Sequence, residues 1–141
     1  DRLLEALGAT VVDFPLKAHC CGGHMTQISE ETALELIRRL LHNAAEYRAD
    51  AIVTVCPMCQ LNLDGYQSHV NQMFGTQYHL PVLFFTQLMG LAFGLGQKEL
   101  GIGSEIVSAK QALDKIGRPE EPEKKEPKRR DKKALPMPSA E

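Results

Sequence analysis

The sequence predicts an α/β fold, with alternating strands and helices and a small, mostly parallel sheet. Three short runs rich in apolar and β-branched residues, 9–14, 51–55 and 81–85, are typical of buried strands. The segments between them repeat apolar residues at helical spacing. Strands this apolar, joined through helices, imply a parallel sheet covered on both faces. Such sheets bind ligands beyond the carboxyl ends of their strands, where we expect a functional site.

The helices are predicted in order along the chain. A first short helix places three leucines on one face and would end at Gly8, a residue typical of helix C-caps. The longest helix, over 29–48, opens with an N-cap serine and two glutamates in its first turn. Three more helices are predicted, over 58–74 with a weak interruption at Gly65, over 86–95 and over about 104–116.

Composition indicates one domain, residues 1–117, followed by a charged tail, residues 118–141. The 141 residues are 43% hydrophobic and 24% charged, which fits a soluble domain with a core. The tail gathers most of the eight prolines and half of the lysines and arginines, so we expect it to be disordered. Its basic run, residues 128–133, could contact an acidic partner or a phosphate, or simply be a solvated tail. Because a helical pattern follows Asp1 at once, we expect the sequence to lack its natural start.

Charge and hydropathy exclude several classes of protein. The net charge of −2 argues against a nucleic-acid partner, because nucleic-acid-binding proteins usually have a basic surface. The most apolar window, residues 80–96, is broken by Thr86, Gln87 and glycines and is shorter than the roughly 20 residues of a membrane span. The first residues lack the basic and apolar regions of a signal peptide. We therefore expect a cytoplasmic protein without a membrane span.

All four cysteines follow predicted strands. Cys20 and Cys21 lie in the loop after residues 9–14, and Cys56 and Cys59 directly follow residues 51–55. Neighbouring cysteines rarely bond to each other because the ring is strained. Pro57 suits the first position of a helix, whose N-terminal dipole favours thiolates at a Cys-x-x-Cys turn. Because parallel strands end at one edge of the sheet, the four thiols are expected to converge there, and the two glycines after Cys21 would let the backbone approach closely.

Spacing alone leaves three interpretations of these thiols. A structural zinc site could use four thiolates, although zinc ligands are usually spaced by two to four residues. A thioredoxin-like dithiol would explain Cys56 and Cys59 but not Cys20 and Cys21. An iron–sulfur cluster would use all four, because neighbouring thiolates can bind different irons.

The motifs "HCCGG" and "CPMCQLNLD" together resemble the cysteine-rich CCG domain, and specifically the B subunit of heterodisulfide reductase. The flanking segments "DRLLEALGATVVDFPLKA" and "LPVLFFTQLMGLAFGL" are similar to that family too, so the resemblance covers roughly residues 1–117. Proteins of the family carry two CCG domains, and this chain resembles the second.

The resemblance implies a non-cubane [4Fe–4S] cluster held by five cysteines, four of which match Cys20, Cys21, Cys56 and Cys59. The fifth lies upstream of the cysteine pair in the family, beyond the start of this sequence. The implied activity is reductive cleavage of a small disulfide, such as the mixed disulfide of coenzymes M and B. The implied electron donor is a partner iron–sulfur subunit.

Two other functions stay open at this point. Related CCG proteins are found in complexes that oxidise lactate, glycolate or glycerol 3-phosphate. A non-catalytic module could instead bind zinc and dock a partner through the basic tail. Beside the thiols, His19 and His24 could protonate a departing thiolate or simply be exposed loop residues. Met58 could pack over a cluster or make an ordinary core contact.

Overall fold

The computed structural model describes residues 1–116, which fold around two short parallel strands. Strand β1 (Ile52–Thr54) pairs with β2 (Val82–Phe84), with Ile52 opposite Val82 and Thr54 opposite Phe84. Both strands lie inside the predicted ranges, and the segment between them is helical. The predicted α/β class with a parallel sheet is therefore confirmed. The parallel register places the carboxyl ends of both strands at the same edge.

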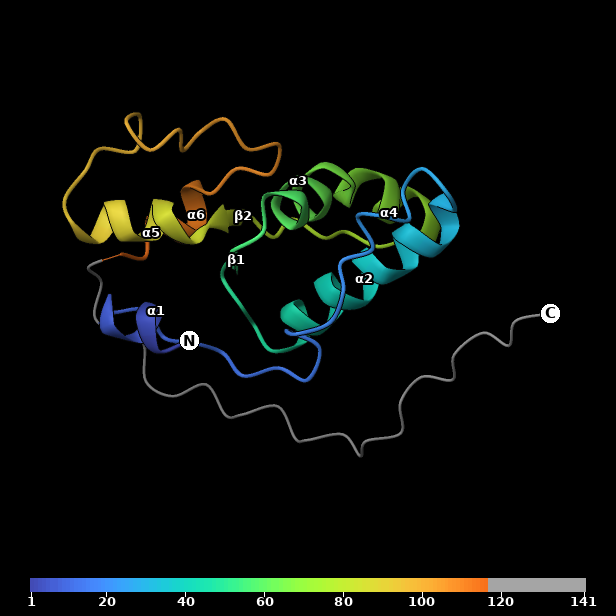
Figure 1. Ribbon diagram of the computed structural model, residues 1–141, viewed down its shortest axis with the longest axis horizontal. Coiled ribbons are helices and arrows are strands. Elements are labelled where there is room, and N and C mark those ends of the chain that lie inside the picture. Colours follow the sequence, from blue (N-terminus) through green and yellow to red (C-terminus); the bar gives the residue numbers. More distant parts are fainter. Residues whose placement is uncertain (117–141) are drawn as a thin grey trace.

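Three helices form most of the core beside these strands. Helix α2 (Glu30–Glu46) packs against α3 (Pro57–Gly65) and α4 (Gln67–Phe74), which follow β1 (Figure 1). Ser29 caps α2 as predicted, since its side chain accepts a hydrogen bond from the N–H of Thr32. The buried core draws on α2, α3, α4, β2 and the loop before α2: Cys21, Leu34, Ile37, Leu40, Leu41, Leu63, Val70 and Val82.

The remaining helices are short. Helix α1 (Arg2–Ala6) is followed by Gly8 at φ +88°, in the left-handed region that favours glycine. Helix α5 (Phe85–Ala92) continues directly from β2, and α6 (Lys110–Leu113) ends the described chain. Figure 1 shows α1 apart from the group of α2, α3 and α4, and the irregular segment between α5 and α6 arching along one edge of the molecule.

Two amide side chains on α4, the buried Gln67 and the half-buried Asn71, hold the segment that leads into β2. Gln67 donates to the Leu80 carbonyl at 2.6 Å and accepts from the Leu80 N–H at 3.0 Å. Asn71, one helical turn later, forms the same pair of hydrogen bonds with the backbone of Tyr78. The two side chains thus take the place of a neighbouring strand, which fixes β2 relative to α4.

The predicted strand over residues 9–14 is wrong, because no residue of this segment joins the sheet. Phe14 packs against the core as a half-buried residue, and so does Leu16, whose N–H donates to Asn43 Oδ1 on α2. An apolar β-branched run forms a strand only where a sheet edge accepts its backbone. Here the segment leading to Cys20 packs against a helix instead.

Two predicted helices also differ from the structure. The segment 104–116 is helical only at Lys110–Leu113, because Asp64 accepts hydrogen bonds from the N–H groups of Ile106 and Val107 and holds them in an irregular loop. The predicted helix over 58–74 divides at Tyr66 into α3 and α4, next to the interruption predicted at Gly65. The predicted tail, 118–141, lies outside the described residues. Within residues 1–116, no helix has the length and apolar character needed to cross a bilayer.

Candidate metal centre

Cys56 and Cys59 are placed by the junction of β1 and α3. Cys56 is the N-cap residue of α3, Pro57 occupies the first helical position, and Cys59 follows within the first turn. The hydroxyl of Thr54, the last residue of β1, accepts from the N–H of Cys56 at 3.0 Å and donates to the Cys56 carbonyl at 3.0 Å. The turn that presents the two thiols is therefore fixed on both sides of the Cys56 peptide.

The loop that carries Cys20 and Cys21 lies against α2. Gly22 adopts φ +76°, and a Cβ atom there would lie 3.0 Å from Leu36 Cδ1 and 3.4 Å from the Ala33 Cα. Only glycine satisfies both the left-handed backbone and this close approach. The turn at Gly22 leaves Cys20 exposed and Cys21 buried. The two neighbouring thiols thus point into different environments.

Cys21 and Cys59, 38 residues apart, are brought together by this packing. Their Sγ atoms are 3.1 Å apart. Asn62, one turn after Cys59 on α3, donates from Nδ2 to the Cys21 carbonyl oxygen at 2.7 Å. The Cys20–Cys21 loop and α3 are therefore joined through both the side chain and the backbone of Cys21.

Cys20 is held apart from this pair. Its Sγ lies 3.9 Å from Nδ1 of His24 and accepts the N–H of Gly22 at 3.4 Å. Across residues 1–116, no three cysteine, histidine or acidic side chains gather closely enough to hold one metal ion. Of the four thiols expected to converge, the structure brings Cys21 and Cys59 into contact, whereas Cys20 would have to turn away from His24 to bind the same group as they do.

The two thiols of the Cys-x-x-Cys turn differ in acidity. The backbone N–H of Cys59, at the positively polarised start of α3, lowers the pKa of Cys56, and the Cys59 thiol and the N–H of Met58 act in the same direction. The Cys56 side chain accepts no capping hydrogen bond, so the N–H groups of α3 stabilise its thiolate through their dipoles. Burial raises the pKa of Cys59 to about 12, and the neighbouring thiols of Cys21 and Cys56 act in the same direction. As the pH rises, Cys56 therefore ionises before Cys59.

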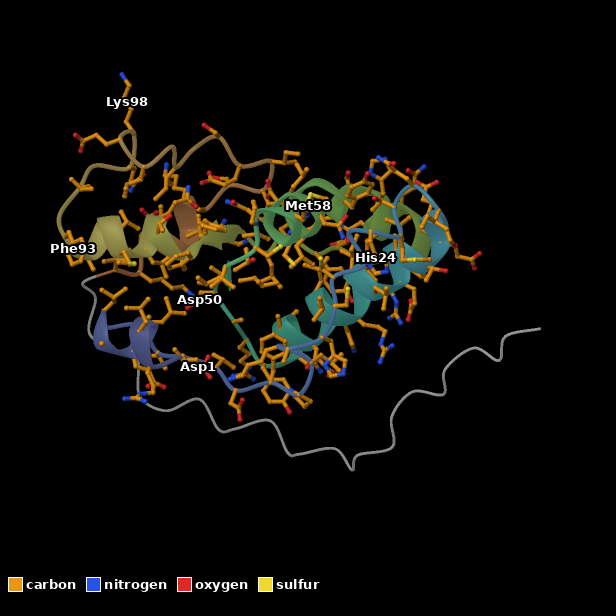
Figure 2. All side chains as sticks on the ribbon, in the orientation of Figure 1. Asp1, His24, Asp50, Met58, Phe93 and Lys98 are labelled. Atoms are coloured by element: carbon orange, nitrogen blue, oxygen red, sulfur yellow. The ribbon has the colours of Figure 1, made fainter. Side chains whose placement is uncertain are left out.

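Exposed apolar and imidazole side chains lie within four residues of the cysteines along the chain. Met58 is 54% exposed, so it makes no ordinary core contact, and Val55 and Leu61 are exposed as well. Figure 2 places Met58 at the start of α3 and His24 on the loop before α2. His24 is the histidine whose ring approaches a cysteine sulfur, whereas His19 is an exposed loop residue.

Two residues that hold the site were not singled out in the sequence. Thr54 supports the Cys56 peptide, and Asn62 supports the Cys21 carbonyl. Thr54 ends an otherwise apolar strand, and a hydroxyl two residues before a turn is a recognisable signal of side-chain to backbone bonding. Asn62 gives no such signal, because its partner lies 41 residues away.

The donor set suits an iron–sulfur group in its chemistry. The four cysteines at the start of α3 and in the loop before α2 are free thiols. Thiolate sulfur is the ligand that iron–sulfur clusters use. The polarised helix start favours the thiolate form of Cys56 that such a group binds, and the buried Cys59 would release its proton on binding. Cys20, Cys21, Cys56 and Cys59 are therefore the residues that would hold such a group.

The fold and the four thiols at its edge define a cysteine-rich α/β domain, and comparison with known proteins identifies its family. The family model of CCG, described as a cysteine-rich domain, matches residues 1–64. The chain thus contains a CCG cysteine-rich domain, and most of its length is homologous to the B subunit of heterodisulfide reductase.

Three relatives illustrate this similarity. The chain is 40% identical over 118 residues to the B subunit of ferredoxin:CoB-CoM heterodisulfide reductase from Methanosarcina mazei, covering 82% of this chain and 39% of the relative. It is 37% identical over 109 residues to the 8-methylmenaquinol:fumarate reductase membrane anchor subunit of Wolinella succinogenes, covering 77% and 38%. It is 30% identical over 101 residues to a protein of Archaeoglobus profundus that is named as similar to the heterodisulfide reductase B subunit, covering 70% and 34%.

The chain therefore spans about two fifths of the length of the first two of these relatives. Their names are those of subunits of redox enzymes, so this chain is related to redox subunits. The resemblance to the CCG domain and to the B subunit of heterodisulfide reductase, which the sequence motifs indicated, is therefore confirmed.

Proposed function

We propose that this chain is the iron–sulfur domain of a redox subunit that reduces a small disulfide. Cys20, Cys21, Cys56 and Cys59 hold a [4Fe–4S] cluster of the non-cubane type. The observation that carries the proposal is the contact between the Cys21 and Cys59 sulfurs at 3.1 Å, which joins the two cysteine motifs across 38 residues. The relatives whose names refer to the heterodisulfide reductase B subunit support the choice of substrate class.

The chain's own residues would bind and shield this group. Cys21, which is 5% exposed, and the half-buried Cys59 would supply ligands from the protein interior. Cys56, whose pKa is lowered by the N–H of Cys59, would supply a ligand that is readily ionised. Cys20, on the exposed side of the loop, would complete the set after turning from His24. When bound, the cluster would supply electrons to the sulfur–sulfur bond of the substrate.

The partners follow from this chemistry. Reduction of a disulfide consumes two electrons, so an iron–sulfur electron-donor subunit must deliver them to this domain. The side chains of Val55, Met58 and Leu61 are exposed within two residues of Cys56 or Cys59 along the chain and could contact the substrate or the donor. We propose a cytoplasmic location. One relative is named a membrane anchor subunit, so binding to a membrane complex is the alternative to test.

Metal and sulfide content test the proposal directly. The chain is reconstituted anaerobically with iron and sulfide, with a small thiol present to fill any position that the chain leaves open, and its iron, sulfide, zinc and visible spectrum are measured. Iron and sulfide in equal amounts with broad visible absorption, lost in C21S and C56S but kept in the exposed control S68A, support the cluster. Stoichiometric zinc without visible absorption would overturn it in favour of a zinc-binding docking module.

A second candidate follows from the relative that is named a fumarate reductase subunit. In this alternative the domain passes electrons within a complex that reduces a substrate other than a disulfide. The reduced, reconstituted chain is mixed with a panel of disulfides, including the CoB–CoM heterodisulfide, and its reoxidation is followed in the visible spectrum. Rapid reoxidation by a disulfide favours the reductase, whereas no reaction with any disulfide favours electron transfer alone.

A further inference from the structure

Asn62 links α3 to the loop that carries the neighbouring cysteines. It is 3% exposed, and its Nδ2 donates to the Cys21 carbonyl oxygen at 2.7 Å. Its side chain also lies against the loop backbone, because a Cβ at Gly23 would be 3.9 Å from Asn62 Cβ and 3.6 Å from Cys21 Sγ. The amide therefore sits directly between α3 and the backbone of the cysteine loop.

Asn62 and Cys59 are three residues apart and so share one face of α3. Both contact Cys21, Cys59 at its sulfur and Asn62 at its carbonyl oxygen. A residue held at its carbonyl and at its side chain has little freedom to rotate about its Cα. The direction in which the Cys21 thiol points is thus set from α3, although Cys21 itself belongs to a loop without regular secondary structure.

We propose that Asn62 is a positioning residue that orients Cys21 for cluster binding. This inference rests on the proposed function and adds to it a residue outside the ligand set. Groups that orient metal ligands through hydrogen bonds contribute to metal affinity even though they do not touch the metal. Without the Asn62 amide, the Cys21 carbonyl loses its partner and the loop is released from α3 at this point.

The chain offers a matched control in Gln67. This residue is also a buried amide, 2% exposed, and it donates to the carbonyls of Leu63 and Leu80 rather than to the cysteine loop. Replacing either amide by leucine removes buried hydrogen bonds and lowers the free energy of unfolding. Of the two changes, the one at Asn62 removes a hydrogen bond to the backbone of a cysteine.

The first experiment measures iron retention. Reconstituted wild type, N62L and Q67L are brought to equilibrium anaerobically with increasing concentrations of an iron chelator, and the chelator concentration that removes half of the visible absorption is compared. We expect N62L to bind iron about 10–100-fold less tightly than the wild type, as when an outer partner of a metal ligand is removed. Q67L should resemble the wild type. Equal retention by N62L and Q67L overturns the proposal.

The second experiment needs no cluster. Diamide oxidises the reduced, metal-free chain: two thiols give up two electrons and two protons to form a disulfide, and the reagent's N=N bond becomes a hydrazine. Peptide mapping by mass spectrometry then shows which cysteines are joined. We expect the yield of the Cys21–Cys59 disulfide, relative to Cys56–Cys59, to be the same in wild type and Q67L and lower in N62L. An unchanged distribution in N62L overturns the proposal.

The two readouts separate the possible failures. If no variant binds iron, the proposed cluster fails while the disulfide map still tests the role of Asn62. If N62L does not fold, as judged by far-ultraviolet circular dichroism, N62S and Q67S are compared in the same way. Serine at position 62 is too short to reach the Cys21 carbonyl but leaves a polar group in its place.

Discussion

Gly22 permits a direct test of how the cysteine loop approaches α2. We predict that Gly22→Ala destabilises the chain, because the new methyl group meets two separate obstacles. The backbone φ of +76° lies in the left-handed region, where a side chain costs about 1–2 kcal/mol. The Cβ would also lie 3.0 Å from Leu36 Cδ1 and 3.1 Å from Leu36 Cβ, closer than ordinary contact.

The expected loss can be worked out from these two contributions. Forcing an extra carbon into a packed site costs about 1–3 kcal/mol. The loss of glycine's freedom in the unfolded chain offsets about 0.4–1 kcal/mol of the total. We therefore expect Gly22→Ala to lower the free energy of unfolding by about 1–5 kcal/mol.

Gly23→Ala is the matched control beside it. A Cβ at Gly23 would meet its nearest atom, Cys21 Sγ, at 3.6 Å, which is ordinary contact, and the residue does not have a left-handed φ. We expect this variant to stay within about 1 kcal/mol of the wild type. Both are measured by urea unfolding of the reduced, metal-free chain, followed by far-ultraviolet circular dichroism. A loss in Gly22→Ala no larger than that in Gly23→Ala would refute the close approach to α2.

Three further predictions address the thiols, an ion pair and a loop. In the metal-free chain at pH 8, iodoacetamide should modify Cys56 faster than Cys59, because the lowered pKa of Cys56 leaves more thiolate and the raised pKa of Cys59 leaves almost none. Peptide mass spectrometry over time measures both rates. Equal rates would contradict the difference in pKa between the two thiols. Hydrogen bonds from Arg38 lower the pKa of Glu35, so the stability that this pair contributes is complete above the ordinary pKa of 4.5 and is lost as the pH falls through the lower folded value. Glu35→Gln should therefore lose less stability on acidification than the wild type, as measured by urea unfolding at several pH values. Equal losses in the two proteins would show that the pair forms no hydrogen bond in solution. Asp64→Ala should speed hydrogen exchange at the two backbone N–H groups that donate to Asp64 and cost about 1–2 kcal/mol; unchanged exchange there would show that the loop before α6 is held otherwise.

Local patterns in the sequence predict the elements that hold the Cys-x-x-Cys turn. The apolar run before Cys56 forms β1, and Pro57 begins α3 at the expected position. The apolar spacing and the Ser29 cap define α2. These features involve residues a few positions apart, whose preferences act over a single turn or strand.

Local patterns fail where distant side chains decide the backbone. Residues 9–14 have the composition of a strand, yet they stay outside the sheet, because Leu16 bonds to Asn43 on α2 and no sheet edge receives them. Residues 104–107 are drawn out of a helix by Asp64, about 40 residues earlier. In both cases a long-range hydrogen bond outweighs a local propensity of a few tenths of a kcal/mol per residue.

The order of amino acids is enough to predict four thiols in two motifs, one of them at the end of a parallel strand and at the start of a helix. Which of these thiols meet depends on how the helices and loops pack. Packing of Gly22 on α2 and of Asn62 on Cys21 brings Cys21 to Cys59 and leaves Cys20 beside His24. The physical reason is that neighbouring residues set local backbone preferences, whereas the meeting of groups 38 residues apart depends on how whole elements pack.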